Sequence, residues 1–520
     1  MAHIYKELLD KIRSGEIKTH EQLELAKARF AKKHSLKKIP KNAEILNALN
    51  EKEYSEFADF LKTKPVRTSS GVANIAVMWL PHDPKDSCPG NCIYCPQGTV
   101  ANHNVPKSYT GTEPTTLRAL RNKFDPYEQI KNRLHHFHIL GQLVDKCELI
   151  IMGGTFLSWT AGERNEFVKR CFDAFNDCDS INLEAAQKTN ETAKKRVIGL
   201  TIETRADFCK DEHIREMLRL GCTRVELGIQ STSDIILKLI NRGHVCKENI
   251  DAIARLKRAG LKVTAHWMPG LTGLYGLDID EEVELFKQLF IADYQPDEIK
   301  IYPVLVIEGT VLYDLWKHGK FKPLTKEQMC ELLIELKKHV PSHVRIKRVM
   351  RDISEKEVSA GPATTNLRQL VHNTINAYKN IPSNTTVCKC IRCREVGLQN
   401  KEPKNVELTI SNYEASNGKE YFISFEDAAQ QLLLGFCRLR IDDDKIGKIR
   451  ELHVYGKMAQ IGKKGDVQHR SLGKQLMQKA EEIAKSHGCK TVQVTSGVGA
   501  REYYKKLGYE PDSVYMAKSI

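Results

Sequence analysis

A regular alternation of short apolar segments with amphipathic ones, between residues 72 and 306, most constrains how this chain can fold. The apolar segments lack the polar alternation of half-exposed strands, so we expect them to be buried on both faces of a parallel sheet. Helical patterns between them predict covering helices. The expected strands are 72–79, 147–154, 196–203, 224–230, 261–268 and 298–306. Six such units fit a partial (β/α)6 barrel, with chemistry at the C-terminal ends of its strands.

The rest of the 520 residues is too long to join the same hydrophobic core. Residues 1–65 carry apolar positions at helical spacing, and beyond residue 404 antiparallel strand patterns precede a helix, a strand and a second helix. The sequence therefore predicts a multidomain α/β protein. We expect its parts to be a basic helical N-terminal region at 1–65, the barrel at 66–343, a basic linker at 344–403 and a mixed α/β domain at 404–520.

The formal net charge of +14 indicates a polyanionic partner rather than a particular fold. One basic stretch contains no acidic residue and suits phosphate contacts, although a solvated face is the simpler interpretation. Its residues are Lys27, Arg29, Lys32, Lys33, Lys37, Lys38 and Lys41. The N-terminal residues lack the apolar core of a signal peptide, and no apolar run could span a bilayer, so we expect a cytoplasmic protein without membrane contact.

Three cysteines, Cys88, Cys92 and Cys95, follow the first expected strand in "DSCPGNCIYCPQG". A zinc site favours a fourth protein ligand, and an ordinary ferredoxin cluster requires four cysteines, but the next cysteine is Cys147. Three thiolates on a four-iron cluster leave one iron open. The spacing resembles that of the radical-SAM superfamily, which implies a 4Fe-4S cluster and S-adenosylmethionine (SAM).

This resemblance assigns SAM contacts to residues at the ends of the expected strands. They are Gly153, Gly154 and Thr155 after the second strand, Glu203 and Arg205 after the third, and Gln230 and Ser231 after the fourth. A surface ion pair is the alternative interpretation of Glu203 and Arg205. Lys300 alternates inward on the sixth strand and is a candidate catalytic residue, with a structural role as the equal alternative.

The segment "DVQHRSLGKQLM" (466–477) places a glycine-containing turn at the start of a helix, where backbone amides bind anions. Together with the preceding strand and the later "GAREYYKKLGYE" it resembles the GNAT acetyltransferase fold. The resemblance implies acetyl-CoA contacts at Glu451, Leu452, His453, Val454, Gln468, His469, Arg470, Ser471, Leu472, Gly473, Lys474, Tyr503 and Tyr504. Ser471 stands where the family has glycine. The two tyrosines are also general-acid candidates, although helical geometry puts one of them in the core.

The combination and order of "SYTGTEPTTLRAL", "MGGTF", "TIETR", "NRGH", "YPVLVIEGT", "RVMRDI", "RELHVYG" and "SGVGAREYYKKLGY" resemble the catalytic-subunit family of Elongator from about residue 64 to the end. The resemblance implies that a SAM-derived radical takes hydrogen from the methyl group of acetyl-CoA, that the carbon radical adds to C5 of the wobble uridine in a tRNA anticodon, and that hydrolysis leaves 5-carboxymethyluridine. It implies tRNA and an external electron donor as partners. The basic residues Arg345, Lys347, Arg348 and Arg351 then become candidate phosphate contacts.

A second cysteine group, Cys388, Cys390 and Cys393, stands in the expected linker. Three thiolates with His372 or His318 would form a structural zinc site, and a second iron–sulfur cluster or three free thiols are the alternatives. The "CKCIRC" stretch resembles the prokaryotic form of the family, which works without other Elongator subunits. Two other functions remain open: a protein lysine acetyltransferase with a structural iron–sulfur domain, and a non-catalytic tRNA-binding platform.

Overall fold

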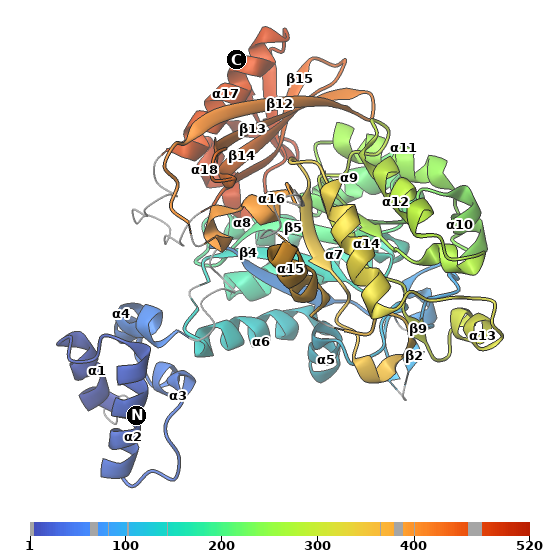
Figure 1. The fold of residues 1–520 in the computed structure, drawn as a ribbon. Coiled ribbons are helices and arrows are strands. Elements are labelled where there is room, and N and C mark those ends of the chain that lie inside the picture. The colour runs from blue at the N-terminus through green and yellow to red at the C-terminus, as the bar shows by residue number, and fades with distance from the viewer. Residues whose placement is uncertain are drawn as a thin grey trace.

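The computed structural model describes residues 5–62, 71–81, 83–100, 103–142, 144–364, 366–378, 388–399, 401–455 and 471–520. Figure 1 shows a helical N-terminal block, a central parallel sheet covered by helices, and a C-terminal domain packed on one end of that sheet. No helix among these residues is long and apolar enough to cross a membrane.

The N-terminal block consists of four helices: α1 (Lys6–Arg13), α2 (His20–Lys33), α3 (Asn42–Asn47) and α4 (Glu51–Leu61). Thr19 and Asn50 begin α2 and α4 with capping boxes, in which Gln22 and Glu53 bond back to the backbone of the cap. Leu23, Phe30 and other apolar side chains form a separate small core.

The central sheet has seven parallel strands in the order β1-β4-β5-β6-β7-β8-β10. Their bounds are β1 (Ala73–Met78), β4 (Lys146–Met152), β5 (Arg196–Thr204), β6 (Arg224–Gln230), β7 (Lys262–Trp267), β8 (Glu298–Ile301) and β10 (Arg345–Val349). The sequence predicted the first six. The seventh, β10, pairs in parallel with β8, so the start of the expected linker at 344–403 belongs to the barrel sheet.

Helices cover this sheet; most of them pack against a large apolar core, and three contribute to smaller apolar clusters. They are α5 (Pro114–Arg121), α6 (Pro126–Ile139), α7 (Ala161–Asn176), α8 (Leu183–Asn190), α9 (Asp211–Arg219), α10 (Asp234–Leu239), α11 (Cys246–Arg258), α12 (Ile279–Lys287), α13 (Val311–Lys317), α14 (Lys326–Lys338) and α15 (Leu367–Tyr378). Two small sheets complete this part: β2 (Thr99–Val100) with β3 (His103–Asn104), and β9 (Val306–Ile307) with β11 (Val358–Ala360).

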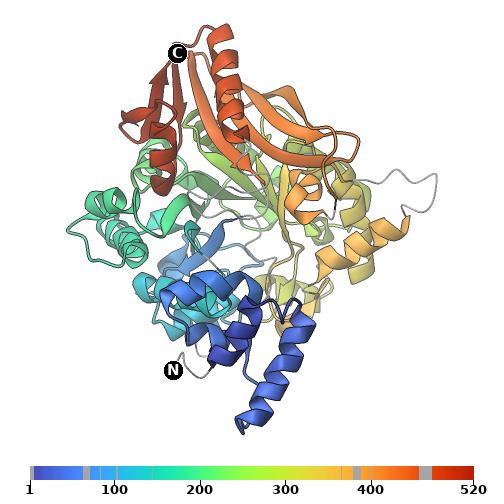
Figure 2. The ribbon, with the colours of Figure 1, turned by 90° about the vertical axis from the view of Figure 1, so that its left-hand side faces the viewer.

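The short helix α16 (Ile391–Arg394) leads into a second seven-stranded sheet, ordered β12-β13-β14-β15-β16-β18-β17. Its strands are β12 (Glu407–Ala415), β13 (Gly418–Asp427), β14 (Leu432–Ile441), β15 (Ile446–Val454), β16 (Thr491–Val494), β17 (Glu510–Asp512) and β18 (Tyr515–Ser519). Helices α17 (Leu472–Ser486) and α18 (Arg501–Lys505) belong to the same domain, and Leu476 and Met477 of α17 lie in its core. Figure 2 shows α17 lying along this sheet.

Buried charges join the two sheets. Arg450 on β15 donates to Asp297 beside β8 (Nη1–Oδ2, 2.8 Å), to the carbonyl of Leu261 (2.9 Å) and to Glu420 on β13 (Nη2–Oε2, 2.8 Å). The Arg450, Asp297 and Glu420 side chains are completely buried. These contacts therefore fix β15 of the C-terminal domain to β8 of the barrel, the strand that carries Lys300.

Candidate active site

The first cysteine group lies on the loop after β1, at the C-terminal end of the barrel strands. Thr155 donates to the sulfur of Cys88 (Oγ1–Sγ, 3.2 Å), and the amide of Gly90 does so at 3.4 Å. Arg242 approaches the sulfur of Cys92 (Nη1–Sγ, 3.6 Å). These donors all favour negatively charged sulfur, as a metal-bound thiolate requires.

Gly153 and Gly154, at the end of β4, pack directly against this loop. Both have positive φ angles, +128° and +99°. A Cβ on Gly154 would lie 2.5 Å from the carbonyl oxygen of Ser87, and the amide of Thr155 donates to the same oxygen at 2.8 Å. Only glycine permits this approach. The structure therefore brings the expected glycine segment next to the cysteines.

The donor set around the cysteines fits an anionic cluster. Arg205 lies over Gly90, and its buried Nη1 has no hydrogen-bond partner in the described part of the chain. Burial, followed by the neighbouring Cys92 and Cys88, raises the pKa of Cys95 to about 12. Burial therefore disfavours a thiolate at Cys95 unless a cation binds there. The buried guanidinium groups of Arg205 and Arg242 suit an anionic cluster or a carboxylate.

A cavity of about 120 Å³ opens beside this loop. Glu203 lines it and accepts from Tyr109 (Oη–Oε2, 3.0 Å). Burial is the main cause that raises the pKa of Glu203 to about 7, with Lys300 acting against it. Gln230 also lines the cavity, whereas the Ser231 hydroxyl accepts from the amide of Ser233 (3.2 Å) within its own turn.

Lys300 is buried and ion-paired with Glu226, and its Nζ lies 4.0 Å from Glu203. Burial alone would lower the pKa of Lys300, but Glu226 raises it above its usual value. His266 contacts the same Glu226 oxygen at 3.1 Å. Lys300 is therefore a buried counter-ion of Glu226, next to the cavity-lining residues Glu203 and His266, which favours its structural interpretation.

Sequence reasoning missed several cavity residues: Tyr94, Tyr109, His266, Tyr302 and, beneath the cavity, Glu226. Tyr109 and Tyr302 stand in the quoted strings "SYTGTEPTTLRAL" and "YPVLVIEGT", but nothing in their spacing gives them a chemical role. Arg242 in "NRGH" was likewise quoted without an assignment. Only the folded chain brings these side chains to one place.

In the C-terminal domain, β15 pairs with β16 only as far as Ile449 and then diverges from it. Residues 451–454 thus remain free of β16 and face the start of α17. A Cβ on Gly473 would lie 3.9 Å from Leu452, 3.7 Å from Val454 and 2.8 Å from the hydroxyl of Tyr503. This opening between two strands, beside a helix N-terminus, suits a thioester and its phosphates.

The remaining expected acetyl-CoA residues divide into distinct environments. Tyr503 is 41% exposed near Gly473, while Tyr504 is buried in the domain core against Tyr509, as expected for one of the pair. Ser471 has φ +53°, a left-handed conformation that explains why glycine suits this position.

Four further members of the set differ in exposure and contacts. Glu451 binds Lys262 of the barrel (3.3 Å) and Arg438 (3.0 Å). Leu472 is buried, His453 is half-buried and Lys474 is exposed. Gln468, His469 and Arg470 lie outside the described residues.

The structure corrects three of the expected phosphate contacts. Lys27 is buried and donates to Glu24 (2.7 Å) and Asn42 (2.8 Å). Arg345 binds Glu395 (2.6 Å), and Lys347 lies 3.4 Å from Glu298 in the barrel. For these residues the prediction is wrong, because their charges are neutralised inside the protein.

The other basic residues remain available. Arg29, Lys32, Lys33, Lys37, Lys38 and Lys41 are exposed, with Lys33 paired to Glu7 (2.8 Å). Arg348 and Arg351 line the cavity: Arg348 pairs with Asp352, and Arg351 donates to the carbonyl of Ser108.

The sulfur atoms of Cys388, Cys390 and Cys393 lie within 4.8 Å of one another, close enough for one metal ion. Neither His372 nor His318 joins them: among the described histidines, cysteines and acids, no fourth ligand lies within that distance. The nearest charged group recorded is Lys337, whose Nζ lies 3.8 Å from the Cys393 sulfur. The sulfurs of Cys88, Cys92 and Cys95 do not meet this single-ion spacing, consistent with a larger cluster.

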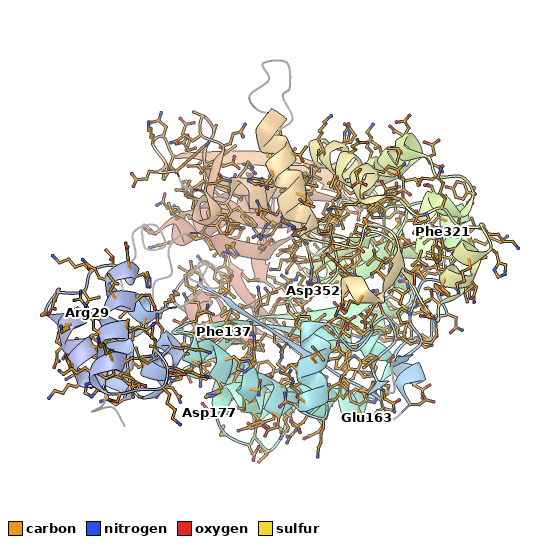
Figure 3. The ribbon with its side chains drawn as sticks, turned by 60° about the horizontal axis from the view of Figure 1, so that its bottom comes forward. Arg29, Phe137, Glu163, Asp177, Phe321 and Asp352 are labelled. Atoms are coloured by element: carbon orange, nitrogen blue, oxygen red, sulfur yellow. The ribbon has the colours of Figure 1, made fainter. Side chains whose placement is uncertain are left out.

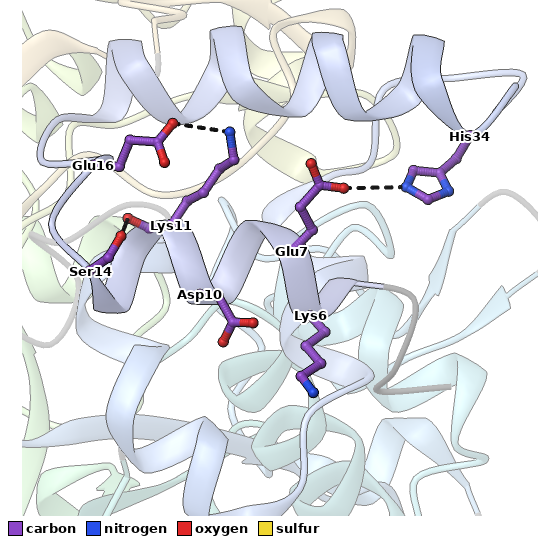
Figure 4. Close-up of a pocket in the computed structure, with 7 residues that line it drawn as sticks. All are labelled: Lys6, Glu7, Asp10, Lys11, Ser14, Glu16 and His34. Carbon is purple, nitrogen blue, oxygen red and sulfur yellow. Dashed lines mark hydrogen bonds and ion pairs between the residues drawn. The ribbon is translucent and has the colours of Figure 1, made fainter.

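A second hollow, of about 630 Å³, lies between α1 and α2 in the N-terminal block. Figure 4 shows that its walls carry surface ion pairs, including Lys11 with Glu16 (3.0 Å) and Glu7 with His34 (3.7 Å). These exposed pairs offer no arrangement for catalysis, so the cavity beside the cysteine loop is the candidate active site.

A partial barrel with a three-cysteine loop, joined to a domain with a splayed β15–β16 pair, defines the class of radical-SAM enzymes fused to an acetyltransferase. Comparison with protein families agrees. Residues 84–289 match the Radical SAM superfamily, 296–377 the Radical_SAM C-terminal domain, 392–509 the Acetyltransferase (GNAT) family and 1–69 the ELP3 N-terminal domain.

The full-length relatives define the family more closely. The chain is 45% identical to "tRNA uridine(34) acetyltransferase" of Methanocaldococcus infernus over 92% of both chains, and 40% identical to "Elongator complex protein 3" of Schizosaccharomyces pombe over 95% of this chain and 94% of the relative. The solved structure of archaeal Methanocaldococcus infernus Elp3 with an N-terminal deletion covers 87% of this chain and 100% of its own, with 41% identity and a TM-score of 0.75. The chain belongs to the Elongator complex protein 3 family.

Proposed function

We propose that this protein modifies the wobble uridine of tRNA, using acetyl-CoA and a SAM-derived radical, to give 5-carboxymethyluridine. The observation that supports the proposal is that buried contacts join the sheet of the cysteine loop to the sheet of the divergent β15–β16 pair. The cysteine loop and the divergent β15–β16 pair belong to sheets that share the buried contacts of Arg450 and Asp297. Relatives with this arrangement are named tRNA uridine(34) acetyltransferases.

In the barrel, separate groups of residues would hold the iron–sulfur cluster and SAM. Cys88, Cys92 and Cys95 would hold a 4Fe-4S cluster, and Arg205 and Glu203 would bind the charged and hydroxyl groups of SAM. When bound, the 4Fe-4S cluster and SAM would together supply a 5′-deoxyadenosyl radical after one-electron reduction by an external donor. No base in the site could remove a proton from the weakly acidic methyl group of acetyl-CoA, and radical chemistry would avoid that proton transfer.

The cavity residues protect and orient the reacting groups. Lys300 would balance the charge of Glu226 beneath the cavity, while Tyr109 would hold the Glu203 carboxyl in place. Bringing C5 of a stacked base into this cavity requires that the uridine be turned out of the anticodon stack. Arg348 and Arg351 at the cavity wall suit the phosphates next to such a base.

In the acetyl-CoA half, the amides at the start of α17 would bind the cofactor's phosphates, and Tyr503 would contact it beside Gly473. Residues 451–454, which β16 leaves unpaired, would hold the acetyl group near the barrel. We also propose that Cys388, Cys390 and Cys393 contribute ligands to a structural zinc ion. Archaeal relatives of full length support activity without other Elongator subunits.

The test uses protein whose cluster has been reconstituted anaerobically. SAM, a reductant and acetyl-CoA are added with and without tRNA, and 5′-deoxyadenosine is measured. The proposal expects SAM cleavage that depends on tRNA and is lost in Cys92→Ser. No SAM cleavage under any condition, together with acetylation of peptides, would instead establish the lysine acetyltransferase alternative.

A further inference from the structure

The C-terminal domain contacts the barrel at a second place, apart from Arg450 and next to the candidate acetyl-CoA site. There the turn 497–500 follows β16 and leads into the short helix α18. Figures 1 and 2 both show α18 lying beside the barrel helix α8. Tyr503 is the only residue of the segment 497–505 that the proposed function uses, so the other residues of this contact have no role in it.

The turn lies directly on the backbone of β5. A Cβ on Gly497 would overlap the carbonyl oxygen of Ile198, and a Cβ on Gly499 would lie 2.5 Å from the Cβ of Arg196. Real side chains do not come so close, so this packing requires glycine at both positions. Val498, between the two glycines, is buried in the apolar core of the barrel rather than in that of its own domain. The barrel therefore fixes where α18 begins.

A buried carboxylate of the barrel also binds α18 itself. Glu191, just after α8, accepts a hydrogen bond from Arg501 (Oε1–Nη1, 3.2 Å) and another from Lys505 (Oε2–Nζ, 3.1 Å). Lys188 on α8 binds the same carboxylate (3.0 Å), Lys505 also binds Glu502 (2.6 Å), and only 5% of the Glu191 side chain is exposed. Positions 501 and 505 are four residues apart and lie on the same face of the helix, so one carboxylate binds both. This contact fixes the rotation of α18 as well as its position.

Hydrogen bonds hold Glu191 in place relative to β5. The neighbouring Asn190 is completely buried; it donates to Asn176 at the end of α7 (Nδ2–Oδ1, 2.8 Å) and accepts from the amide of Val197 on β5 (2.8 Å). Figure 3 labels Asp177, which follows Asn176 at this end of α7. The carboxylate that binds α18 and the strand that carries the turn therefore belong to one fixed part of the barrel.

Tyr503 lies on the other side of α18. Because an α-helix has about 3.6 residues per turn, Tyr503 points nearly opposite to Arg501 and Lys505, which stand two residues away on either side. Tyr503 is exposed, and its hydroxyl lies 2.8 Å from the place of a Cβ on Gly473, at the start of α17. The barrel thus binds one face of α18, and the candidate acetyl-CoA contact stands on the opposite face.

We propose that Glu191 is a positioning residue for acetyl-CoA, which it affects through α18 and Tyr503. The inference rests on the proposed function, because it takes Tyr503 as an acetyl-CoA contact. Helix α18 has only five residues, too few for a stable helix without outside contacts. The barrel supplies these contacts, so the acetyl-CoA site is complete only when the two domains are packed together. Glu203, in the active-site cavity, lies near the other end of β5, so one strand orients both cofactor sites.

The test is a calorimetric titration of the full-length protein with acetyl-CoA, without added SAM or tRNA. Glu191→Gln keeps the side-chain volume but removes the charge shared by Arg501 and Lys505, and should weaken binding about threefold to tenfold. Tyr503→Ala should also weaken binding, because it removes the contact itself. In the Tyr503→Ala background, Glu191→Gln should cause little further loss, since both substitutions act through the same side chain.

Two further variants make the result specific. Glu184→Gln removes the same charge from the same helix, where Glu184 binds Arg219 of α9 (3.3 Å), and should keep the wild-type affinity. Arg501→Gln breaks the contact from the side of α18 and should weaken binding as Glu191→Gln does, without removing any group from the barrel.

The outcomes separate this inference from the proposed function. Wild-type affinity in Glu191→Gln would overturn the inference, even if the wild type modifies tRNA. An equal loss with and without the Tyr503 side chain would overturn it too, because it indicates a general loosening of the structure. Unchanged affinity in Tyr503→Ala would remove the contact on which the inference rests and so overturn it. Coupled losses, with no modified uridine from the wild type, would support the inference and refute the proposed function.

Discussion

Replacing Arg450 by methionine tests whether one buried side chain holds the two catalytic halves together. In the wild type this guanidinium binds Asp297 and Glu420, and neither carboxylate has any exposed surface. Methionine fills a similar volume but leaves both carboxylates without their main cation. Removing one partner from a buried ion pair costs about 3–5 kcal/mol, so we expect a loss of stability in that range.

The assay is urea unfolding followed by tryptophan fluorescence. All four tryptophans, Trp79, Trp159, Trp267 and Trp316, lie in the barrel, whereas Arg450 lies in the C-terminal domain. A shift in the tryptophan signal therefore reports stabilisation of one domain by the other. Lys257 (3.6 Å) and Arg438 (3.8 Å) remain beside Asp297 in the methionine variant. Adding Asp297→Asn removes a buried carboxylate that has lost its main cation, and should recover about 1 kcal/mol.

The control is Arg13→Met, which breaks a pair with Glu56 of similar length (2.8 Å) on the surface of the N-terminal block. Water already solvates both of these charges, so we expect little change in the transition. The reasoning would be refuted if Arg450→Met unfolded at the same urea concentration as the wild type, or if the second substitution lowered stability further by its full separate cost.

Three other substitutions test the sites. Gly154→Ala should destabilise the cysteine loop by more than about 1 kcal/mol, because Gly154 has a positive φ angle and lies close to the Ser87 carbonyl. Thermal unfolding and the iron content after reconstitution measure this effect. A normal iron content would contradict the prediction. Glu203, with its pKa raised to about 7, binds more protons when folded than when unfolded, so its own contribution to stability should fall as pH rises from about 4.5 to 7. Glu203→Gln should flatten that part of the stability profile, and an unchanged profile would show that Glu203 does not titrate there. Gly473→Ala should keep or raise thermal stability by up to about 1 kcal/mol, yet weaken acetyl-CoA binding by displacing the Tyr503 hydroxyl; calorimetry that finds unchanged affinity would exclude this contact.

The sequence predicted the architecture well where a pattern is local. The near-continuous apolar runs become β1 and β4 to β8, and the cysteines follow β1 as expected. The seventh strand, β10, was missed because Arg345, Lys347 and Arg348 make its sequence look like a basic surface. Their charges meet partners such as Glu395 and Glu298, which are distant in sequence, and no local pattern reveals such pairing.

The site was predictable to the extent that motifs carried it. Gly153 to Thr155 and Gly473 stand where conformation or close packing restricts the residue, and such positions are visible as glycine motifs. Glu226, His266 and Tyr109 meet only through the order of the barrel strands, so their arrangement required the structure. Lys27 shows the opposite error: a lysine in a basic stretch is buried against Asn42, since helix packing rather than composition decides exposure.

The most direct test of the central claim uses acetyl-CoA labelled with deuterium on its methyl group. Reconstituted protein is given this substrate with SAM, a reductant and tRNA, and both 5′-deoxyadenosine and the tRNA nucleosides are analysed by mass spectrometry. The account predicts one deuterium in 5′-deoxyadenosine and two in the 5-carboxymethyl group of the product. Unlabelled 5′-deoxyadenosine, with all three deuterons transferred as an intact acetyl group, would contradict it.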